Sequence, residues 1–180
     1  MSDGTMSPLA VDLDGTLILT DMSWVSINKI LLRKPWKIFW IFLKEITGQR
    51  AKWKRSLAES LKFDPSDLKY HREFLDWLTG ERARGRELIL ATASDRIIAE
   101  QIAGYLALFS DVMASDNDVN LRGSLKAEAL ISRFGKGGFA YAGNSKHDLD
   151  VWKHAGQTIV VNPDRGILDK LGEDADIIFE

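Results

Sequence analysis

The feature that most constrains the fold of this chain is a short apolar run that ends in two carboxylates and a glycine. Leu9, Ala10 and Val11 are followed directly by Asp12-Leu13-Asp14-Gly15. Such a run predicts a buried β-strand, and the alternation of Asp12, Leu13 and Asp14 puts both acids on one side of the chain where the strand stops. Ligands of open α/β sheets bind beyond the carboxyl ends of the strands, so we expect functional chemistry at this edge.

Two carboxylates this close repel each other unless a cation lies between them. Oxygen ligands favour a hard divalent cation, most simply Mg²⁺, and Gly15 allows the chain to turn tightly away from the strand. The alternative interpretation is a strand followed by an ordinary Asp-Gly turn that carries no site. The residues in the remainder of the chain have to show which of the two interpretations applies.

The rest of the sequence alternates apolar runs with segments of helical periodicity. The predicted strands are 87–92, 112–114, 139–142, 158–161 and 177–179, and the predicted helices between them are 97–106, 124–134, 149–155 and 167–171. This alternation predicts an α/β fold, a Rossmann-like and mostly parallel sheet with helices on both faces. We expect residues 1–19 and 85–180 to form this core, and residues 20–84 to form an all-helical insertion with a return helix.

Length and composition favour one domain and exclude several kinds of site. The 180 residues suffice for a single domain with a full core, and the absence of cysteine excludes disulfides, thiol nucleophiles and thiolate metal sites. Residues 1–8 lack the basic start and apolar segment of a secretory signal. The longest apolar run, 38–43, has six residues, whereas a membrane-spanning helix needs about 20. We therefore expect a cytoplasmic protein.

The charge is unevenly distributed along the chain. Residues 21–55 contain nine basic and two acidic residues, although the whole chain has a net charge of -2, and four of the six tryptophans lie in the same stretch. Positive charge combined with aromatic rings is typical of helices at a membrane surface. The alternative is an insertion that packs its aromatic residues internally and presents a basic rim to a phosphate ester. Nucleic-acid binding is not required to explain this charge.

Polar residues follow several of the predicted strands, and because parallel strands end at the same edge of a sheet, we expect these residues to converge. They are Asp12, Asp14, Thr92, Lys126 and the loop from Asn144 to Asp148. A carboxylate nucleophile, a second acid, a hydroxyl and an ammonium suit phosphoryl transfer, which depends on positioning and on neutralising charge at the transferring oxygens. Among the three histidines, His147 is the one placed to contact substrate or metal.

The segment Asp12-Leu13-Asp14-Gly15-Thr16-Leu17 resembles the D-x-D-G-T-L signature of the haloacid dehalogenase (HAD) superfamily. The remaining motifs of that superfamily fall in order at Thr92, Lys126 and residues 143–148, so the resemblance spans nearly the whole chain. It implies that Asp12 attacks phosphorus to form an aspartyl-phosphate and that Asp14 acts as acid and then as base, which favours a phosphatase. It also implies that Thr92 hydrogen-bonds a phosphate oxygen and that Lys126 neutralises the phosphate and the nucleophile.

The resemblance further implies a Mg²⁺ ion held by the Asp12 carboxylate, the Asp14 main-chain carbonyl, Asn144 and Asp148. The usual G-D-x-x-x-D loop of the superfamily is here Gly143-Asn144-Ser145-Lys146-His147-Asp148, with a neutral amide at the position of a metal-binding carboxylate. Because an amide oxygen can still bind a cation, we expect weaker metal binding rather than none. A catalytically attenuated regulatory or docking domain is the alternative that this departure leaves open.

The helical insertion resembles the small helical cap of the phosphoserine-phosphatase-like branch, which closes over the site and selects substrate. The overall pattern is also similar to the phosphatase-like domain that precedes polyprenyl-transferring membrane prenyltransferases. The resemblance thus implies a phosphorylated small molecule or a lipid-linked phosphate as substrate. It also implies an association with a membrane surface or a prenyltransferase through the basic aromatic stretch. A phosphotransferase or mutase that uses the same aspartyl-phosphate is a further variant.

Overall fold

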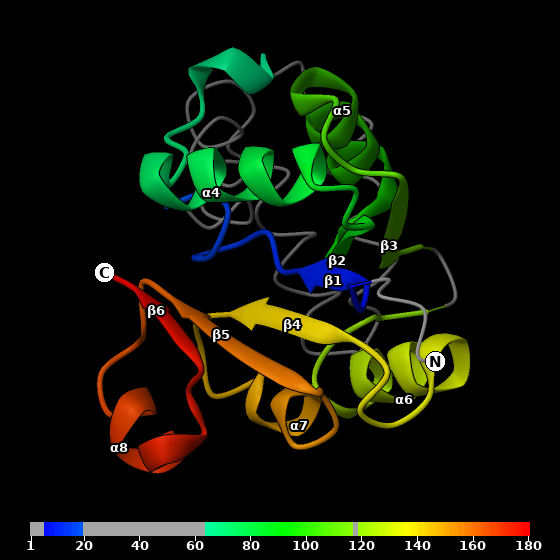
Figure 1. The fold of residues 1–180 in the computed structure, drawn as a ribbon. Helices are drawn as coiled ribbons and strands as arrows, with labels where there is room; N and C mark the ends of the chain where they lie inside the picture. Colours follow the sequence, from blue (N-terminus) through cyan, green and yellow to red (C-terminus); the bar gives the residue numbers. More distant parts are fainter. Residues whose placement is uncertain (1–5, 20–63, 117–118) are drawn as a thin grey trace, which may run out of the picture.

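The fold is seen in a computed structural model that describes residues 6–19, 64–116 and 119–180 (Figure 1). The helices predicted between residues 20 and 61, and with them the helical cap, lie outside the described residues. They therefore stay predictions, as does the division into core and insertion at residues 19 and 85. The predicted α/β architecture can be compared directly with the structure, because every strand predicted from the sequence lies in the described ranges.

Six parallel strands form one sheet in the order β3-β2-β1-β4-β5-β6 (Figure 1). The strands are β1 (Leu9–Val11), β2 (Leu88–Asp95), β3 (Asp111–Ser115), β4 (Ala140–Gly143), β5 (Gln157–Val161) and β6 (Ile177–Phe179). Leu9 pairs with Leu88 of β2 on one side and with Ala140 of β4 on the other. The strand order reverses between β1 and β4, and such a switch point opens a crevice at the carboxyl ends of the strands where ligands bind.

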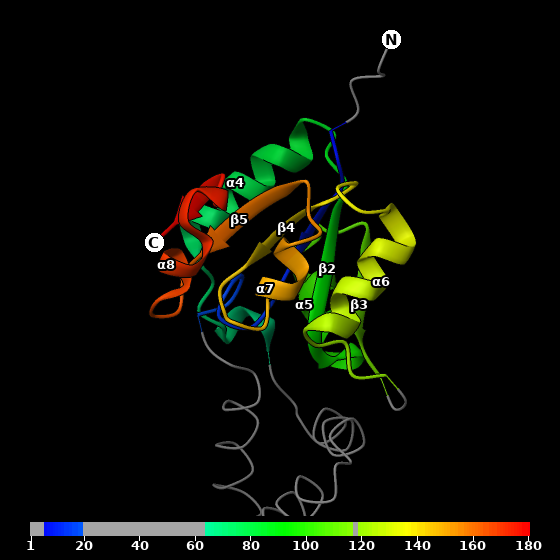
Figure 2. The ribbon, with the colours of Figure 1, turned by 90° about the horizontal axis from the view of Figure 1, so that it is seen from below.

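Helices cover both faces of the sheet, which confirms the predicted Rossmann-like arrangement. They are α4 (Arg72–Ala83), α5 (Arg96–Leu106), α6 (Ser124–Phe134), α7 (Leu149–Trp152) and α8 (Ile167–Leu171), with short 3-10 turns at η1 (Pro65–Asp67) and η2 (Gly172–Asp174). Figures 1 and 2 show α4 and α5 on one face and α6, α7 and α8 on the other. Within the described ranges, no helix is both long enough and apolar enough to span a membrane.

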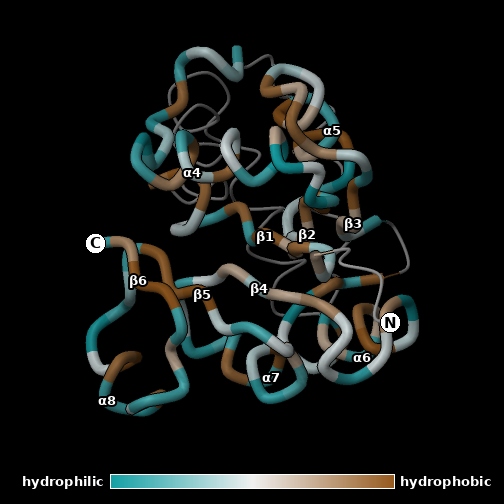
Figure 3. Tube along the Cα trace, viewed as in Figure 1, coloured by the Kyte–Doolittle hydropathy of each residue, from teal (hydrophilic) through white to brown (hydrophobic). Residues whose placement is uncertain are grey.

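The two faces of the sheet carry two separate hydrophobic cores. In β1, Leu9 and Val11 pack into the core under α4 and α5, whereas Ala10 packs into the core under α6, α7 and α8. Successive side chains of a strand point to opposite faces, so the all-apolar run found in the sequence fills both cores at once. Figure 3 shows the same distribution, with hydrophobic colours along the strands and hydrophilic colours in the loops around α7 and α8.

Helix α4 packs against one face of the sheet. His71 caps its first turn by accepting a hydrogen bond at Nδ1 from the Phe74 backbone N–H at 3.3 Å, so the helix begins at Arg72. Phe74 and Leu78 are fully buried in the same core as Leu9. The return helix that the sequence placed with the insertion therefore contributes directly to the core of the α/β domain.

Candidate active site

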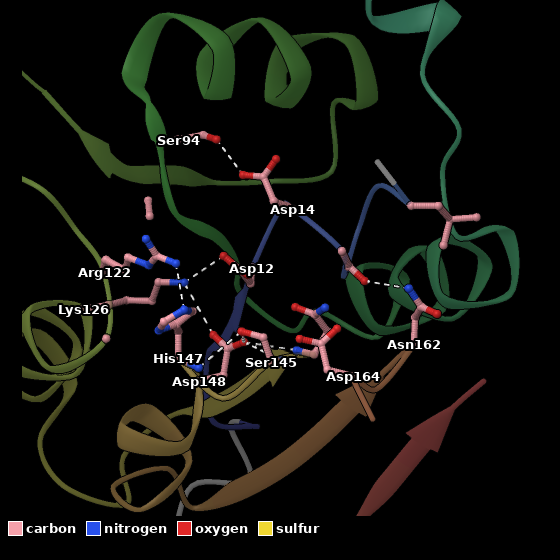
Figure 4. A pocket seen from close by; sticks show the side chains of 15 residues that line it. Asp12, Asp14, Ser94, Arg122, Lys126, Ser145, His147, Asp148, Asn162 and Asp164 are labelled. Carbon is pink, nitrogen blue, oxygen red and sulfur yellow. Dashed lines mark hydrogen bonds and ion pairs between the residues drawn. The ribbon is translucent and has the colours of Figure 1, made fainter. Parts of the chain in front are cut away.

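A cavity of about 500 Å³ lies at the carboxyl ends of β1, β2, β4 and β5 (Figure 4). Its walls include five of the residues and loops that the sequence predicted to converge: Asp12, Asp14, Lys126, Asn144 and Asp148. Ser145, from the predicted loop, lines it too, as do residues that the sequence did not single out, among them Arg122, Asn162 and Asp164. The volume lies in the range typical of small-molecule sites.

The turn after β1 is fixed by its backbone and by the absence of a side chain at Gly15. Asp12 donates its N–H to the Ala142 carbonyl of β4 at 2.9 Å, and Gly15 donates to the Ile18 carbonyl at 2.8 Å. Gly15 has a φ of +79°, and a Cβ atom there would lie 2.4 Å from Nδ2 of Asn144. Glycine is thus required both for the backbone conformation and for the close approach of the β4 loop.

Lys126 connects the nucleophile candidate to the loop after β4. It lies in the first turn of α6, where its buried Nζ donates to Asp12 Oδ1 at 2.7 Å and to the Tyr141 hydroxyl at 2.8 Å. The same ammonium lies 3.7 Å from Asp148 Oδ1. Residues 12, 126 and 148, far apart in the sequence, therefore meet within the reach of single side chains, as the parallel-sheet prediction requires.

The Asp148 carboxylate accepts four hydrogen bonds from neighbouring groups. Its Oδ1 accepts a 2.5 Å hydrogen bond from Tyr141, and its Oδ2 accepts from the backbone N–H groups of Asn144 and Ser145 and from the Ser145 hydroxyl at 3.0 to 3.2 Å. A side chain at Gly143 would collide with Asp148, since a Cβ atom there would lie 2.7 Å from its Cγ. Asp148 thus fixes the conformation of the 143–148 loop.

The buried charges are one ammonium between two carboxylates. Burial raises the pKa of Asp12 to about 7 in spite of the opposing effect of Lys126, and Asp148 and Asp14 add to the rise. Burial would also raise the pKa of Asp148, but Lys126 and the hydrogen bonds outweigh it and lower that pKa. For Lys126, burial is outweighed by the two carboxylates, which raise its pKa. Asp148 therefore keeps the negative charge, and Asp12 is the carboxylate whose charge is poorly compensated.

Asp14 is oriented by a serine from the end of β2. The Ser94 hydroxyl donates to Asp14 Oδ2 at 2.6 Å, and the Ser94 backbone N–H donates to Thr92 Oγ1 at 3.0 Å. Thr92 is fully buried and does not line the cavity, so the hydroxyl that β2 presents there is that of Ser94. The phosphate contact implied for Thr92 stays a prediction. Asp95 caps helix α5, because its side chain accepts from the Ile97 N–H at 2.9 Å.

The loop after β5 also reaches the cavity. Asn162, with a φ of +47°, donates from Nδ2 to the Gly15 carbonyl at 3.1 Å, and Asp164 donates its N–H to the Asn144 carbonyl at 2.9 Å. These contacts tie the turn after β1 to the neighbouring loops. The Asn-Pro-Asp run after a predicted strand was a signal for a turn, but periodicity gave no indication of where this turn would lie.

On the opposite wall, Arg122 Nη2 lies 2.7 Å from His147 Nε2. Burial, Arg122 and Lys146 lower the pKa of His147. The histidine singled out in the sequence thus does line the cavity, but it contacts an arginine that the sequence pattern did not identify.

The residues present fit a divalent cation. The polar side chains of the described residues in the cavity carry oxygen and nitrogen and no sulfur, and four acidic side chains outnumber the two basic ones. Asp12 Oδ2 forms no hydrogen bond with any described residue, and burial, with Asp148 and Asp14 adding to it, raises the pKa of this carboxyl. No group of three His, Asp or Glu residues in the described ranges could hold a metal by itself. A divalent cation bound here would therefore also need a main-chain carbonyl or the Asn144 amide as a ligand, and both suit Mg²⁺.

A central parallel strand followed by two acids, with a helix lysine and a polar loop directed at them, is the arrangement that the sequence resemblance predicted. Solved structures support this fold. A protein of unknown function from Bordetella pertussis Tohama I superposes with a TM-score of 0.75 at 15% identity, over 98% of this chain and 99% of that one. A substrate-bound phosphoserine phosphatase gives a TM-score of 0.64 at 17% identity, over 99% of this chain and 94% of that one.

A HAD family hydrolase from Salmonella enterica serovar Typhi, with a TM-score of 0.62 and 16% identity, covers 91% of this chain and 66% of its own. The chain therefore has the fold of HAD family hydrolases. No protein-family model matches the sequence. The uncharacterized protein y4nM of Sinorhizobium fredii is 32% identical over 166 residues, which is 92% of this chain but 32% of that protein. The chain thus spans about a third of the length of this curated relative.

Proposed function

We propose that this chain is a Mg²⁺-dependent phosphatase that hydrolyses a phosphate monoester through an aspartyl-phosphate on Asp12. The observation that supports this most directly is the 2.7 Å contact between Lys126 Nζ and Asp12 Oδ1 at the carboxyl end of the central strand. A buried carboxylate held by an ammonium in a cavity suits nucleophilic attack on an anionic phosphate, because the ammonium can offset the charge of both.

In the proposed reaction each side chain has a separate task. Lys126 holds Oδ1 of Asp12, so Oδ2 attacks phosphorus while the ester P–O bond breaks. Asp14, oriented by Ser94, donates a proton to the departing oxygen. The resulting Asp14 carboxylate then takes a proton from water, and that water attacks the aspartyl-phosphate, which releases inorganic phosphate and restores Asp12.

Asp12, the main-chain carbonyl of Asp14 and Asn144 are the groups that would hold Mg²⁺. When bound, the cation supplies positive charge that reduces the repulsion between the phosphate and the Asp12 carboxylate. Asp148 has a different task in this proposal, because its oxygens already accept hydrogen bonds from the protein. It holds Asn144 and Ser145 in place and keeps Lys126 directed into the cavity.

The substrate class that we propose is a phosphorylated small molecule. The cavity volume of about 500 Å³ leaves room for more than a phosphate group, and the similar structures include a phosphoserine phosphatase in complex with substrate. A lipid-linked or prenyl-linked phosphate is the more specific form of this proposal. It is supported by the excess of basic and tryptophan residues between 21 and 55, a composition suited to anionic headgroups.

The test is phosphate release from a panel of soluble and polyprenyl-linked monoesters, measured with Mg²⁺ and with a chelator. Asp12→Asn should abolish turnover, by a factor of about 10³ or more, because the amide is not a nucleophile. Asp169→Asn, which removes an exposed acid of α8 away from the cavity, should keep full activity. A smaller loss of turnover in the Asp12→Asn protein would refute the aspartyl-phosphate mechanism.

A second candidate function is a catalytically attenuated domain that docks on a membrane surface or a membrane prenyltransferase. The observation that favours it is Asn144, a neutral side chain in the cavity where a carboxylate would strengthen metal binding. Co-sedimentation with vesicles containing anionic lipid distinguishes the two. Binding to these vesicles by a protein that hydrolyses no monoester would support docking, whereas phosphatase activity without vesicle binding would support the enzyme.

A further inference from the structure

We propose that Arg122, held by His147, forms a subsite for a second anionic group of the substrate, a carboxylate or a second phosphate beside the reacting one. The proposal rests on the proposed phosphatase function and makes its substrate class more specific. Arg122 and His147 line the same cavity as Asp12 and Lys126 (Figure 4).

Two neighbouring contacts join the segment that carries Arg122 and Lys126 to the loop that ends at Asp148. Lys126 in the first turn of α6 lies 3.7 Å from Asp148, and Arg122, four residues earlier, lies 2.7 Å from His147, which directly precedes Asp148. The His147 backbone N–H in turn donates to the Ser145 hydroxyl at 3.3 Å. Arg122 is therefore fixed next to the group that neutralises the reacting phosphate, and at the outer rim of the cavity.

The hydrogen bond to His147 does not neutralise the positive charge of Arg122. Arginine has only N–H donors, so Nε2 of His147 must accept this hydrogen bond and the imidazole is neutral in this arrangement. Four other arginines of the described ranges contact carboxylates: Arg84 and Arg86 pair with Glu81, Arg96 with Glu100, and Arg133 with Asp111 and Glu87. Arg72, Arg82 and Arg165 form no such pair with a described acid, but none of them lines the cavity. Arg122 has no ion pair with any described acid, whereas the charge of Lys126 is already shared by two carboxylates.

The chemistry of the guanidinium determines the class of ligand. Its planar set of donors binds carboxylate or phosphate through two parallel hydrogen bonds, and one N–H directed at His147 leaves further donors for such a group. Since four acidic side chains line the cavity, an anion without a fixed cation beside it would be repelled. A substrate with an anionic group at both ends would be recognised at Lys126 by one end and at Arg122 by the other.

Three phosphate monoesters of equal chain length test this subsite: propyl phosphate, 3-phosphonooxypropanoate and propane-1,3-diyl bisphosphate. The wild-type protein should show a higher kcat/KM for at least one anionic-tailed compound than for propyl phosphate, and the two compounds distinguish a carboxylate from a phosphate ligand. Arg122→Gln should reduce this preference about 10- to 100-fold, the usual effect of losing a hydrogen bond to a charged group. Arg165→Gln, which removes an exposed charge near the cavity without altering its lining, should retain the preference.

The same three compounds, titrated calorimetrically into the Asp12→Asn protein with and without Arg122→Gln, measure binding independently of turnover. A preference for an anionic tail that Arg122→Gln removes supports the subsite even if no compound is hydrolysed, and the absence of hydrolysis by the wild type would count against the phosphatase proposal alone. Equal binding of all three compounds would overturn the subsite. An equal loss for all three compounds on Arg122→Gln would also overturn it, because Arg122 would then act on the reacting phosphate.

Discussion

The substitution Tyr141→Phe tests the physical origin of the buried charge cluster. The Tyr141 hydroxyl donates to Asp148 Oδ1 at 2.5 Å and accepts from Lys126 Nζ at 2.8 Å. Phenylalanine keeps the ring that packs on Trp152 and removes only the oxygen. The change therefore affects two hydrogen bonds to charged groups and leaves the hydrophobic packing of β4 unchanged.

The expected loss in the free energy of unfolding depends on which contacts each charged group keeps in the variant. A hydrogen bond to a charged group contributes about 1.5–3 kcal/mol, and a buried charge left without a partner costs more. Lys126 keeps its 2.7 Å bond to Asp12, and Asp148 keeps Lys126 at 3.7 Å, so the two losses do not add fully. We expect the free energy of unfolding to fall by about 2–3 kcal/mol, which for a chain of this size lowers the Tm by roughly 4–12 °C.

Chemical denaturation at neutral pH without added metal measures this change directly. The matched control is Tyr105→Phe, because Tyr105 is 53% exposed and stacks on Tyr70 without a hydrogen bond in the described part of the chain. This variant should be within about 0.5 kcal/mol of the wild type. If Tyr141→Phe destabilised the protein no more than the control does, the hydroxyl would not hold Asp148 and Lys126 in the way the geometry indicates.

Two further predictions concern charge in the same cavity. Asn144→Asp should tighten Mg²⁺ binding about tenfold and lower the Tm of the metal-free protein, since it adds an acid beside Asp12 and Asp148. Isothermal titration calorimetry measures the Mg²⁺ affinity, and thermal melting with a chelator measures the Tm. A weaker Mg²⁺ affinity of the variant would contradict the prediction. In the metal-free wild type, the free energy of unfolding should fall as the pH rises from about 4 to about 7. The reason is that folded Asp12 keeps its proton up to about pH 7, whereas the unfolded chain loses it near 3.8. Asp12→Asn should flatten this slope, and an unchanged slope would show that another group titrates.

Much of the fold could be predicted because its signals are local. The apolar run before Asp12 and the alternation of strands with helices predicted a parallel sheet with helices on both faces, and the helix 124–134 was placed with the same bounds that the structure shows. The start of α4 at Arg72 could not be predicted, because the His71 cap depends on a side-chain hydrogen bond that periodicity does not reveal. The predicted long helix after Asp148 ends at Trp152, three residues early.

The prediction of the candidate site was likewise successful for some residues and not for others. The sequence identified Asp12, Asp14, Lys126, Asn144 and Asp148, since each follows or begins an element at the expected edge, and the structure brings all five to one cavity. It did not identify Tyr141, because an aromatic residue within an apolar strand is normally core and only its pairing with Lys126 and Asp148 shows otherwise. It did not identify the contact of the Ser94 hydroxyl with Asp14, because the direction of each side chain at a strand end depends on the local backbone. The phosphate contact implied for Thr92 stays a prediction.

By itself, the sequence determined which chemical groups this protein brings to the edge of its sheet, since residue types and their spacing along strands are local properties. Only the tertiary structure decided how the charge is shared among them. One ammonium lies between two buried carboxylates, and four hydrogen bonds stabilise the charge of Asp148 but not that of Asp12. Such differences depend on distances between residues far apart in the chain, and these distances are fixed only when the strands pair and the helices pack.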